Sequence, residues 1–448
     1  MPDNLEVTRR LARFVAETEW HALPSPVVHQ AKRALVNFFA VALTGCGEGA
    51  IETLLQSLAT FSGGQQATVI GRGARLDALS AAFLNAASAN VLDFCDTHVP
   101  TVIHPTAPVA PALFALGELK RVSGHDLILA FVLGAEIECR IGLAISPSHY
   151  RRGWHITATC GVFGAAAASG KILALKTEPM VSALGLAATQ AAGLCECLGT
   201  PAKSVHVGNA ARNGLWSALL AAQGLTGPAE PLTGGQGYFH ALAETPQLSA
   251  LSDGLGDSWQ IMKTAFKPYP CGFVVHPVLD CVIDWRRAHS DAIVEKVTVT
   301  GNPLLAARTD RPNISTSGQS QVSVQHAVAA ALVTGKAGVE QFGACVNDPR
   351  VIALRGKVAV KRDDSFATTA AAVEIATADG KLHKLHQRAA RGSDDNPLTD
   401  KDLEQKLRDA AEHAIPRNDI AALIEAIWTL EACPDIARLS ALTVPRAN

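Results

Sequence analysis

The chain has 448 residues, of which 48% are hydrophobic and 18% charged, and its formal net charge at pH 7 is −2. This length exceeds one ordinary hydrophobic core, so we expect two domains. The balanced charge, without a long run of one sign, argues against nucleic acid or an anionic membrane as a partner.

No stretch approaches the roughly 18 uninterrupted apolar residues of a membrane span. The first residues, MPDNLEVTRRLARFVAETEW, lack the charged-then-apolar pattern of a secretory signal. The ten cysteines are scattered, with no C-x-x-C pair. We therefore expect a cytoplasmic protein with free, mostly buried thiols. Cys195 and Cys197 flank Glu196, and because zinc sites use wider spacing we expect this pair to serve in packing.

Helices are expected over about the first 260 residues, where apolar residues recur at helical spacing. Ser25-Pro26 is typical of a helix start, and the pattern that follows stops at Gly45. Asp77 is predicted to cap the next long helix. Two Ala/Gly-rich stretches are apolar on nearly every side, which indicates central helices packed closely through small residues: 162–175 and 183–194.

The pattern changes after Lys267. Three stretches alternate in the manner of strands: 296–301, 357–362 and 371–385. The last contains Asp379-Gly380, a hairpin turn signal. Residues 323–335 are typical of a helix.

Helical sequence returns at Thr399, with Thr399 and Glu404 near a capping position. The predicted protein is mainly α. It has a large all-helical domain and a smaller α+β lid domain of about 130 residues. The expected boundaries are 1–266 for the helical domain, completed by 395–448, and 267–394 for the lid.

The densest polar cluster is LDFCDTHVPTVIHP, residues 92–105, directly after an apolar helix. Asp93 and Thr97 are four residues apart and are expected to share one helix face, with Asp96 offset. His104 precedes a new helical stretch, so it is expected near a helix N-terminus, where backbone N–H groups favour anions. Capping of a helix end would explain one or two of these residues, but not the full set.

A second cluster, HYRRGWHITATCG, stands before a very apolar helix and contains Tyr150 and His155. Arg151 and Arg152 are suited to binding carboxylates of a ligand. A solvated basic loop explains the two arginines equally well.

A third cluster, TPAKSVHVGNAARNG, places Lys203 and His206 among small residues. A lysine that is desolvated in a helical core can act as a base near neutral pH, whereas most lysines point to water. A fourth cluster, FKPYPCGFVVHP, opens the second domain with Lys267 and His276, which are expected to face the first domain across a cleft. Cys271 permits a thiol nucleophile, but no local motif or orienting carboxylate supports it.

Several motifs are absent: G-x-G-x-x-G after a strand, Walker A, H-E-x-x-H and G-x-S-x-G. Chemistry carried by His, Lys, Asp and Tyr suits proton transfer. A metalloenzyme using His98, His104 and His155 is an alternative, although ligands at regular helical spacing are missing. A helical scaffold protein with a degraded site is another alternative, although all residues of the clusters are present.

These four clusters, in this order, resemble the MmgE/PrpD family. The family pattern is D-F-x-D-T…H-P, then G-[FW]-H, then K…H-x-G-x-A-A, then K-x-[YF]-P…H-P. The likeness extends from about residue 7 to about residue 410. This chain departs from the pattern at Cys95, where an acidic residue is common, and in a longer spacing before His104.

The resemblance implies a helical domain joined to an α+β lid, a homodimer, a small polycarboxylate substrate, and neither metal nor organic cofactor. It implies catalytic roles for Asp93, His104, His155 and Lys203, to which we add Tyr150. The expected substrate-binding residues are Thr97, Arg152, His206, Lys267 and His276.

Family members include 2-methylcitrate dehydratase, cis-aconitate decarboxylase and iminodisuccinate epimerase. All three reactions pass through carbanion-like or enolate-like species beside a carboxylate, and they differ in what leaves and where a proton returns. The overall resemblance, which includes the segments HYRRGWH and YPCGFVVHP, implies an epimerase of the iminodisuccinate type. The alternatives are a dehydratase of the 2-methylcitrate type and a decarboxylase of the cis-aconitate type.

Overall fold

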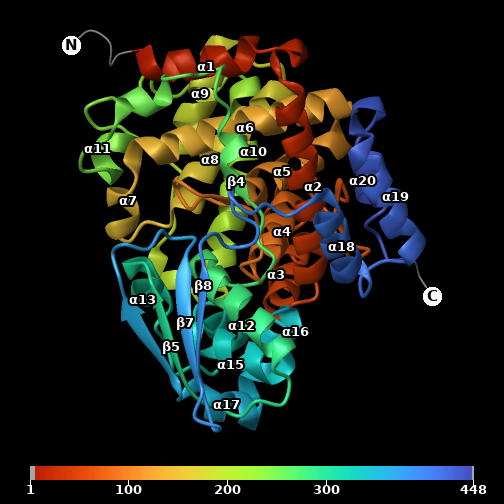
Figure 1. The fold of residues 1–448 in the computed structure, drawn as a ribbon. Helices are drawn as coiled ribbons and strands as arrows, with labels where there is room; N and C mark the ends of the chain where they lie inside the picture. The colour runs from red at the N-terminus through yellow and green to blue at the C-terminus, as the bar shows by residue number, and fades with distance from the viewer. Residues whose placement is uncertain (1–5, 446–448) are drawn as a thin grey trace.

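A computed structural model describes residues 6–445 and shows a large helical domain beside a smaller part that carries a sheet (Figure 1). In Figure 1 the helices of the N-terminal half occupy the upper part, and strands β5, β7 and β8 lie below them with α12, α15 and α17. The prediction of a mainly helical protein with a smaller α+β part is confirmed. We call residues 267–394 the α+β region.

Within residues 6–445, the helical domain contains eleven α-helices from the first part of the chain and three from its last part. They are α1 (Val7–Glu17), α2 (Ser25–Gly45), α3 (Gly49–Ala59), α4 (Ala78–Asn90), α5 (Thr106–Leu119), α6 (Gly124–Ile145), α7 (Ser148–Arg151), α8 (Ile156–Ile172), α9 (Thr177–Ala188), α10 (Ala202–Ala222), α11 (Tyr238–Leu242), α18 (Asp400–Ala411), α19 (Arg417–Trp428) and α20 (Ala437–Ala441).

Helices α8 and α10 pack against each other at the centre of this domain. Their close approach depends on small residues, as the Ala/Gly-rich sequence predicts. A Cβ atom added to Gly214 of α10 would lie 2.5 Å from the Cβ atom of Ala165 in α8, so glycine is required at this contact. Asp77 caps α4 as predicted, because its carboxylate accepts a hydrogen bond from the backbone N–H of Ser80.

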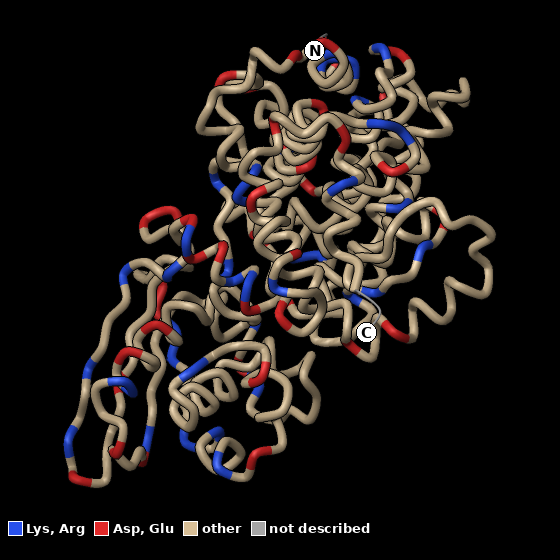
Figure 2. The backbone as a smooth tube through the Cα atoms, turned by 90° about the vertical axis from the view of Figure 1, so that its right-hand side faces the viewer, with Lys and Arg blue, Asp and Glu red and all other residues tan. Residues whose placement is uncertain are grey.

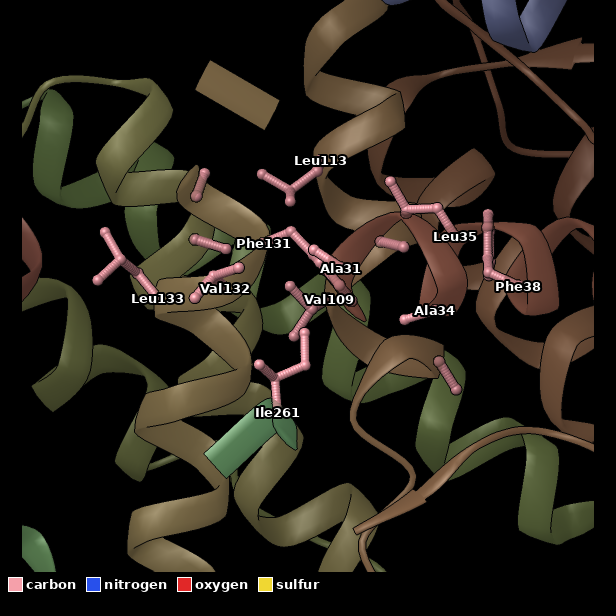
Figure 3. Close-up of a cluster of buried hydrophobic side chains, with 14 of the residues drawn as sticks. Ala31, Ala34, Leu35, Phe38, Val109, Leu113, Phe131, Val132, Leu133 and Ile261 are labelled. Carbon is pink, nitrogen blue, oxygen red and sulfur yellow. The ribbon is translucent and has the colours of Figure 1, made fainter. Parts of the chain in front are cut away.

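Side chains of α2, α5 and α6 meet in the main hydrophobic core (Figure 3). Leu35 of α2, Leu113 of α5 and Phe131 of α6 are each no more than 1% exposed. Burying one such side chain contributes about 1.5–3 kcal/mol. Because the core is continuous across these helices, it gives the site a rigid support.

The α+β region is built on a four-stranded mixed sheet of order β6-β5-β7-β8. Strand β5 runs parallel to β6 and antiparallel to β7, and β7 and β8 form a hairpin at Asp379-Gly380, as predicted. The predicted helix at 323–335 is also present, capped by Ser323 and ended by left-handed Gly335. The elements are α12 (His276–Ala288), β5 (Val294–Gly301), α13 (Pro303–Thr309), α14 (Ser317–Ser320), α15 (Val324–Thr334), α16 (Val339–Phe342), α17 (Pro349–Arg355), β6 (Val358–Arg362), β7 (Ala371–Thr377) and β8 (Leu382–Gln387).

The last helices pack back onto the first part of the chain, with α18 and α19 against α2. Lys32 of α2 donates hydrogen bonds to Glu431 at 2.7 Å and to the carbonyl of Trp428 at 3.1 Å. Thr399 caps α18 as predicted, but its reciprocal partner is Asp402 rather than Glu404. The C-terminal helices therefore complete the helical core.

Charged residues of both signs are scattered over the molecule (Figure 2), as the sequence predicts. Among residues 6–445, no single helix is long and apolar enough to cross a membrane. The pair α2 and α3 passes such a test only jointly, and it is bent by 86°. All ten cysteines are free thiols.

Candidate active site

The turn after α4 places the first site residue. Helix α4 ends at Asn90, and Asp93 adopts a left-handed backbone conformation with φ of 50°. Such a conformation is uncommon for a residue other than glycine and is frequent at functional sites. The expectation that Asp93 and Thr97 share a helix face is therefore wrong, because the helix stops before either residue.

A short strand pair brings the second domain's lysine to this turn. Thr97 and His98 form β3 (Thr97–His98), which pairs antiparallel with β4 (Thr264–Ala265). Lys267 follows β4 by two residues, and its ammonium reaches the Asp93 turn. Two segments about 170 residues apart in sequence are thus joined by the β3–β4 pairing and by the hydrogen bond from Lys267 Nζ to the Asp93 carbonyl.

The Asp93 carboxylate lies between two lysines. Lys203 Nζ is 2.5 Å from Oδ1, and Lys267 Nζ is 3.0 Å from Oδ2 and 2.9 Å from the Asp93 carbonyl oxygen. Lys267 is 1% exposed and Lys203 7%. Burial alone would raise the pKa of Asp93, but the two ammonium groups outweigh it and hold that pKa well below its usual range. The carboxylate is ionised at every physiological pH.

His104 faces the same carboxylate as a neutral base. Its Nδ1 donates to the carbonyl of Asp96 at 2.7 Å, which places the proton on Nδ1 because a carbonyl only accepts. Its Nε2 is then unprotonated and lies 3.8 Å from Asp93 Oδ1. Burial, with the charges of Lys267 and Lys203, lowers the pKa of His104 to about 3. Thr97 Oγ1 lies 3.2 Å from Nδ1 and helps to fix the ring.

His155 begins α8 and is a second uncharged imidazole. Its backbone N–H donates to the carbonyl of Gly193, and its ring stacks on that of His206 at 4.6 Å between centroids. Burial, together with His206, lowers the pKa of His155 well below its usual range. A Cβ atom on Gly193 would lie 2.8 Å from the Ala158 Cβ atom, so only glycine fits beside this pair.

Two carboxyl groups lie behind the site. Asp96 Oδ2 accepts from Thr106 Oγ1 at 2.5 Å, while burial raises the pKa of Asp96 to about 6. Glu138 of α6 is fully buried, and neither of its oxygens has a hydrogen-bond partner among the described residues. Burial, and then Asp96, raises the pKa of Glu138 well above its usual range.

A cavity of about 860 Å³ lies between the helical domain and the α+β region. Eight of the predicted site residues line it: Asp93, Thr97, His104, Tyr150, Arg152, His155, Lys203 and Lys267. The other two predicted residues do not. His206 lies behind His155, and His276 is fully buried with Nε2 3.3 Å from the carbonyl of Cys271. Their expected substrate contact is therefore corrected to a place behind the cavity wall.

The thiol alternative at Cys271 finds no support, because Cys271 is 1% exposed and burial raises the pKa of its thiol. The alternative of a metal site at His98, His104 and His155 finds no support either. His98 bonds to Thr101 at 2.8 Å, and within residues 6–445 no group of three His, Cys, Asp or Glu side chains is placed to hold a metal ion.

Sequence reasoning missed three contributors. Lys406 of α18 donates to Asn37 Oδ1 and to the carbonyls of Phe94 and Lys267, at 2.7–3.0 Å, and so ties both sides of the Asp93 cluster together. Arg308 of α13 lines the cavity and stacks over Tyr150. Cys195 also lines the cavity, so the CEC segment does more than pack. Of these three residues, only Cys195 had been singled out from the sequence, as part of the CEC segment.

These features define a two-domain protein with a lysine–aspartate–histidine cluster in a cavity between its domains. The chain belongs to the MmgE/PrpD family. Residues 9–251 match the MmgE/PrpD N-terminal domain and residues 269–431 match the MmgE/PrpD C-terminal domain.

Similar proteins cover nearly the whole chain. The cis-aconitate decarboxylase-like protein oryM of Aspergillus oryzae is 28% identical over 97% of each chain. The cis-aconitate decarboxylase of Mus musculus is 27% identical over 97% of this chain and 93% of its own length. The cis-aconitate decarboxylase of Homo sapiens is 27% identical over 97% and 94%, respectively.

Proposed function

We propose that this protein is an acid–base lyase that acts beside a carboxylate of a small tricarboxylate of the cis-aconitate type. One observation carries the proposal: the Asp93 carboxylate is held between the ammonium groups of Lys203 and Lys267, beside the neutral His104. The names of the similar proteins support decarboxylation as the leading reaction.

The charges of the cluster suit an anionic substrate. Two lysines share one carboxylate and His104 is neutral, so the buried cluster carries a surplus positive charge. Positive groups fixed in a cavity of low dielectric stabilise both a bound carboxylate and the negative charge that develops beside it. Asp93 keeps the two ammonium groups at fixed positions.

The proposed decarboxylation needs a proton donor. Loss of carbon dioxide from the CH2–carboxylate arm leaves an electron pair that forms a new C=C bond, and the pair of the original double bond takes up one proton beside the far carboxylate. A trianion and one proton thus give a dianion and carbon dioxide. We assign the donor to Lys203 Nζ, whose proton solvent then replaces, and we assign fixation of the carboxylates to Lys267, Thr97 and Arg152.

A second candidate is epimerisation, for which a different observation speaks. His104 and His155 are both uncharged. Nδ1 of His155 has no hydrogen-bond partner among the described residues, and Nε2 of His104 has only the 3.8 Å contact with Asp93. An epimerase needs one group to remove a proton beside a carboxylate and another to return it on the opposite face, with Tyr150 as a further donor. Iminodisuccinate is the substrate we propose for this case. A dehydratase of the 2-methylcitrate type would need only one of these two histidines as its base.

Proton NMR in D2O separates these reactions. The purified protein is mixed in turn with cis-aconitate, 2-methylcitrate, citrate and iminodisuccinate. A new vinyl signal with release of carbon dioxide means a decarboxylase, and a vinyl signal without it means a dehydratase. Deuterium at the carbon beside a carboxylate, with no alkene, means an epimerase.

Lys203→Ala provides the matched test of the site. Asp93 keeps its partner Lys267 in this variant, so the fold should persist while turnover falls at least 100-fold, in the range of a lost general acid. Lys401→Ala, an exposed lysine of α18, is the control. Unchanged turnover in folded Lys203→Ala would remove Lys203 from the mechanism, and no reaction with any of the four compounds would refute the substrate class.

A further inference from the structure

The wall of the cavity contains a positive group outside the Asp93 cluster. Arg308 lies in the last turn of α13 in the α+β region and is half-buried. Its guanidinium carbon is 4.4 Å from the centroid of the Tyr150 ring, which belongs to α7 of the helical domain. The contact spans the two parts of the molecule and holds the guanidinium over an aromatic face.

Arg308 has no anionic partner. Its guanidinium makes no hydrogen bond or ion pair with any residue in 6–445, and its single described contact is the Tyr150 ring. Other half-buried arginines are paired with a carboxylate, as Arg72 is with Glu52 and Arg33 with Asp400. A guanidinium carries five N–H donors in a planar fork that matches a carboxylate. Arg308 therefore presents unused donors to the cavity.

Tyr150 interacts with both Arg308 and the Asp93 carboxylate. Burial raises the pKa of its hydroxyl, and the charges of both Arg308 and Asp93 act on it. Lys203 and Lys267 form one positive region at the Asp93 carboxylate, and Arg308 over the Tyr150 ring forms another. A ligand that satisfies both must carry negative groups at two separated positions.

We propose that Arg308 forms a second carboxylate subsite, which binds a carboxylate remote from the reacting carbon and so selects substrates with at least two separated carboxylates. This inference rests on the proposed function, since it assumes that the reacting end of the substrate lies at the Asp93 cluster. It also gives the α+β region a direct part in substrate recognition.

The test is isothermal titration of the full chain with three unreactive probes that differ in carboxylate number: butyrate, glutarate and tricarballylate. For the parent protein we expect affinity to rise with each carboxylate. Arg308→Met should weaken tricarballylate and glutarate binding roughly 10- to 100-fold, as expected for a charge-assisted bidentate contact, and leave butyrate unchanged. Arg308→Lys should recover part of the loss. Arg287→Met, an exposed arginine of the same region, is the control.

The outcomes separate the subsite from the function. If Arg308→Met binds all three probes as the parent does, the subsite is refuted and the proposed function stands. If it weakens butyrate as much as tricarballylate, Arg308 has only a structural role and the subsite is refuted as well. If the parent binds none of the probes but turns over a tricarboxylate, the subsite alone fails. If it neither binds nor turns over, both proposals fail.

Discussion

Replacement of Asp93 by asparagine should destabilise the protein strongly, because Asp93 is the shared partner of two buried ammonium groups. At the 3.0 Å separation of Lys267 Nζ and Asp93 Oδ2, the attraction at an effective dielectric constant of 20 is about 5 kcal/mol. Removing one partner of a buried ion pair costs about 3–5 kcal/mol in total. We expect Asp93→Asn to lower the free energy of unfolding by about 3–5 kcal/mol at pH 7.

The effect should depend on pH in one direction. The pKa of Asp93 is lowered in the folded state, so its contribution is complete above its unfolded pKa of about 3.9 and is lost as the pH falls below it. The difference in unfolding free energy between parent and Asp93→Asn should therefore narrow by about 1.4 kcal/mol per pH unit below about pH 4.

Urea unfolding followed by tryptophan fluorescence, from pH 7 to pH 3, measures this difference. Asp409→Asn, an exposed carboxylate of α18, serves as the control and should stay within about 0.5 kcal/mol of the parent. A difference for Asp93→Asn below 1 kcal/mol at pH 7, or one that does not change with pH, would refute the reasoning about the cluster.

Three further predictions concern the surroundings of the site. Lys406→Met should reduce kcat/KM at least tenfold in steady-state assays, because the carbonyls of Phe94 and Lys267 lose their donor, whereas Lys401→Met on the same helix should not. Because the folded pKa of Asp96 is raised to about 6, the parent should lose about 3 kcal/mol of unfolding free energy as the pH rises from about 4 to about 6. Asp96→Asn should not show this loss, and equal pH profiles of the two proteins in urea unfolding would contradict the prediction. Leu113→Ala should lower the unfolding free energy by about 2–5 kcal/mol and leave KM unchanged, and a kinetic defect without a stability defect would be the contrary result.

Local sequence patterns predicted the elements of the fold well where the cause is local. Alternating residues predicted β5 and the β7–β8 hairpin, and Asp77 predicted a helix cap, because these signals act between residues a few positions apart. The Asp93 turn was predicted wrongly. The helical spacing of Asp93 and Thr97 is real, but a left-handed residue after Asn90 breaks the helix, and nothing in the spacing encodes it.

The site was predicted only in part for a similar reason. Residues in compact polar clusters, such as His104 and Lys203, were found because several chemistry-bearing residues stand close together in the sequence. Lys406 and Arg308 each stand alone in ordinary helical sequence, and they reach the site through contacts with segments more than 100 residues away. Such contacts depend on the packing of the whole chain.

The return of the C-terminal helices to α2 has a consequence for synthesis on the ribosome. Lys32 and Glu431 are 399 residues apart in sequence, yet their side chains form a hydrogen-bonded ion pair. While the chain is being made, the surface of α2 that α18 and α19 later cover stays exposed until those two helices have been synthesised. The nascent protein thus exposes apolar surface of α2 while more than 350 residues are added, so we expect it to need a chaperone more than a chain whose domains are each completed in sequence order.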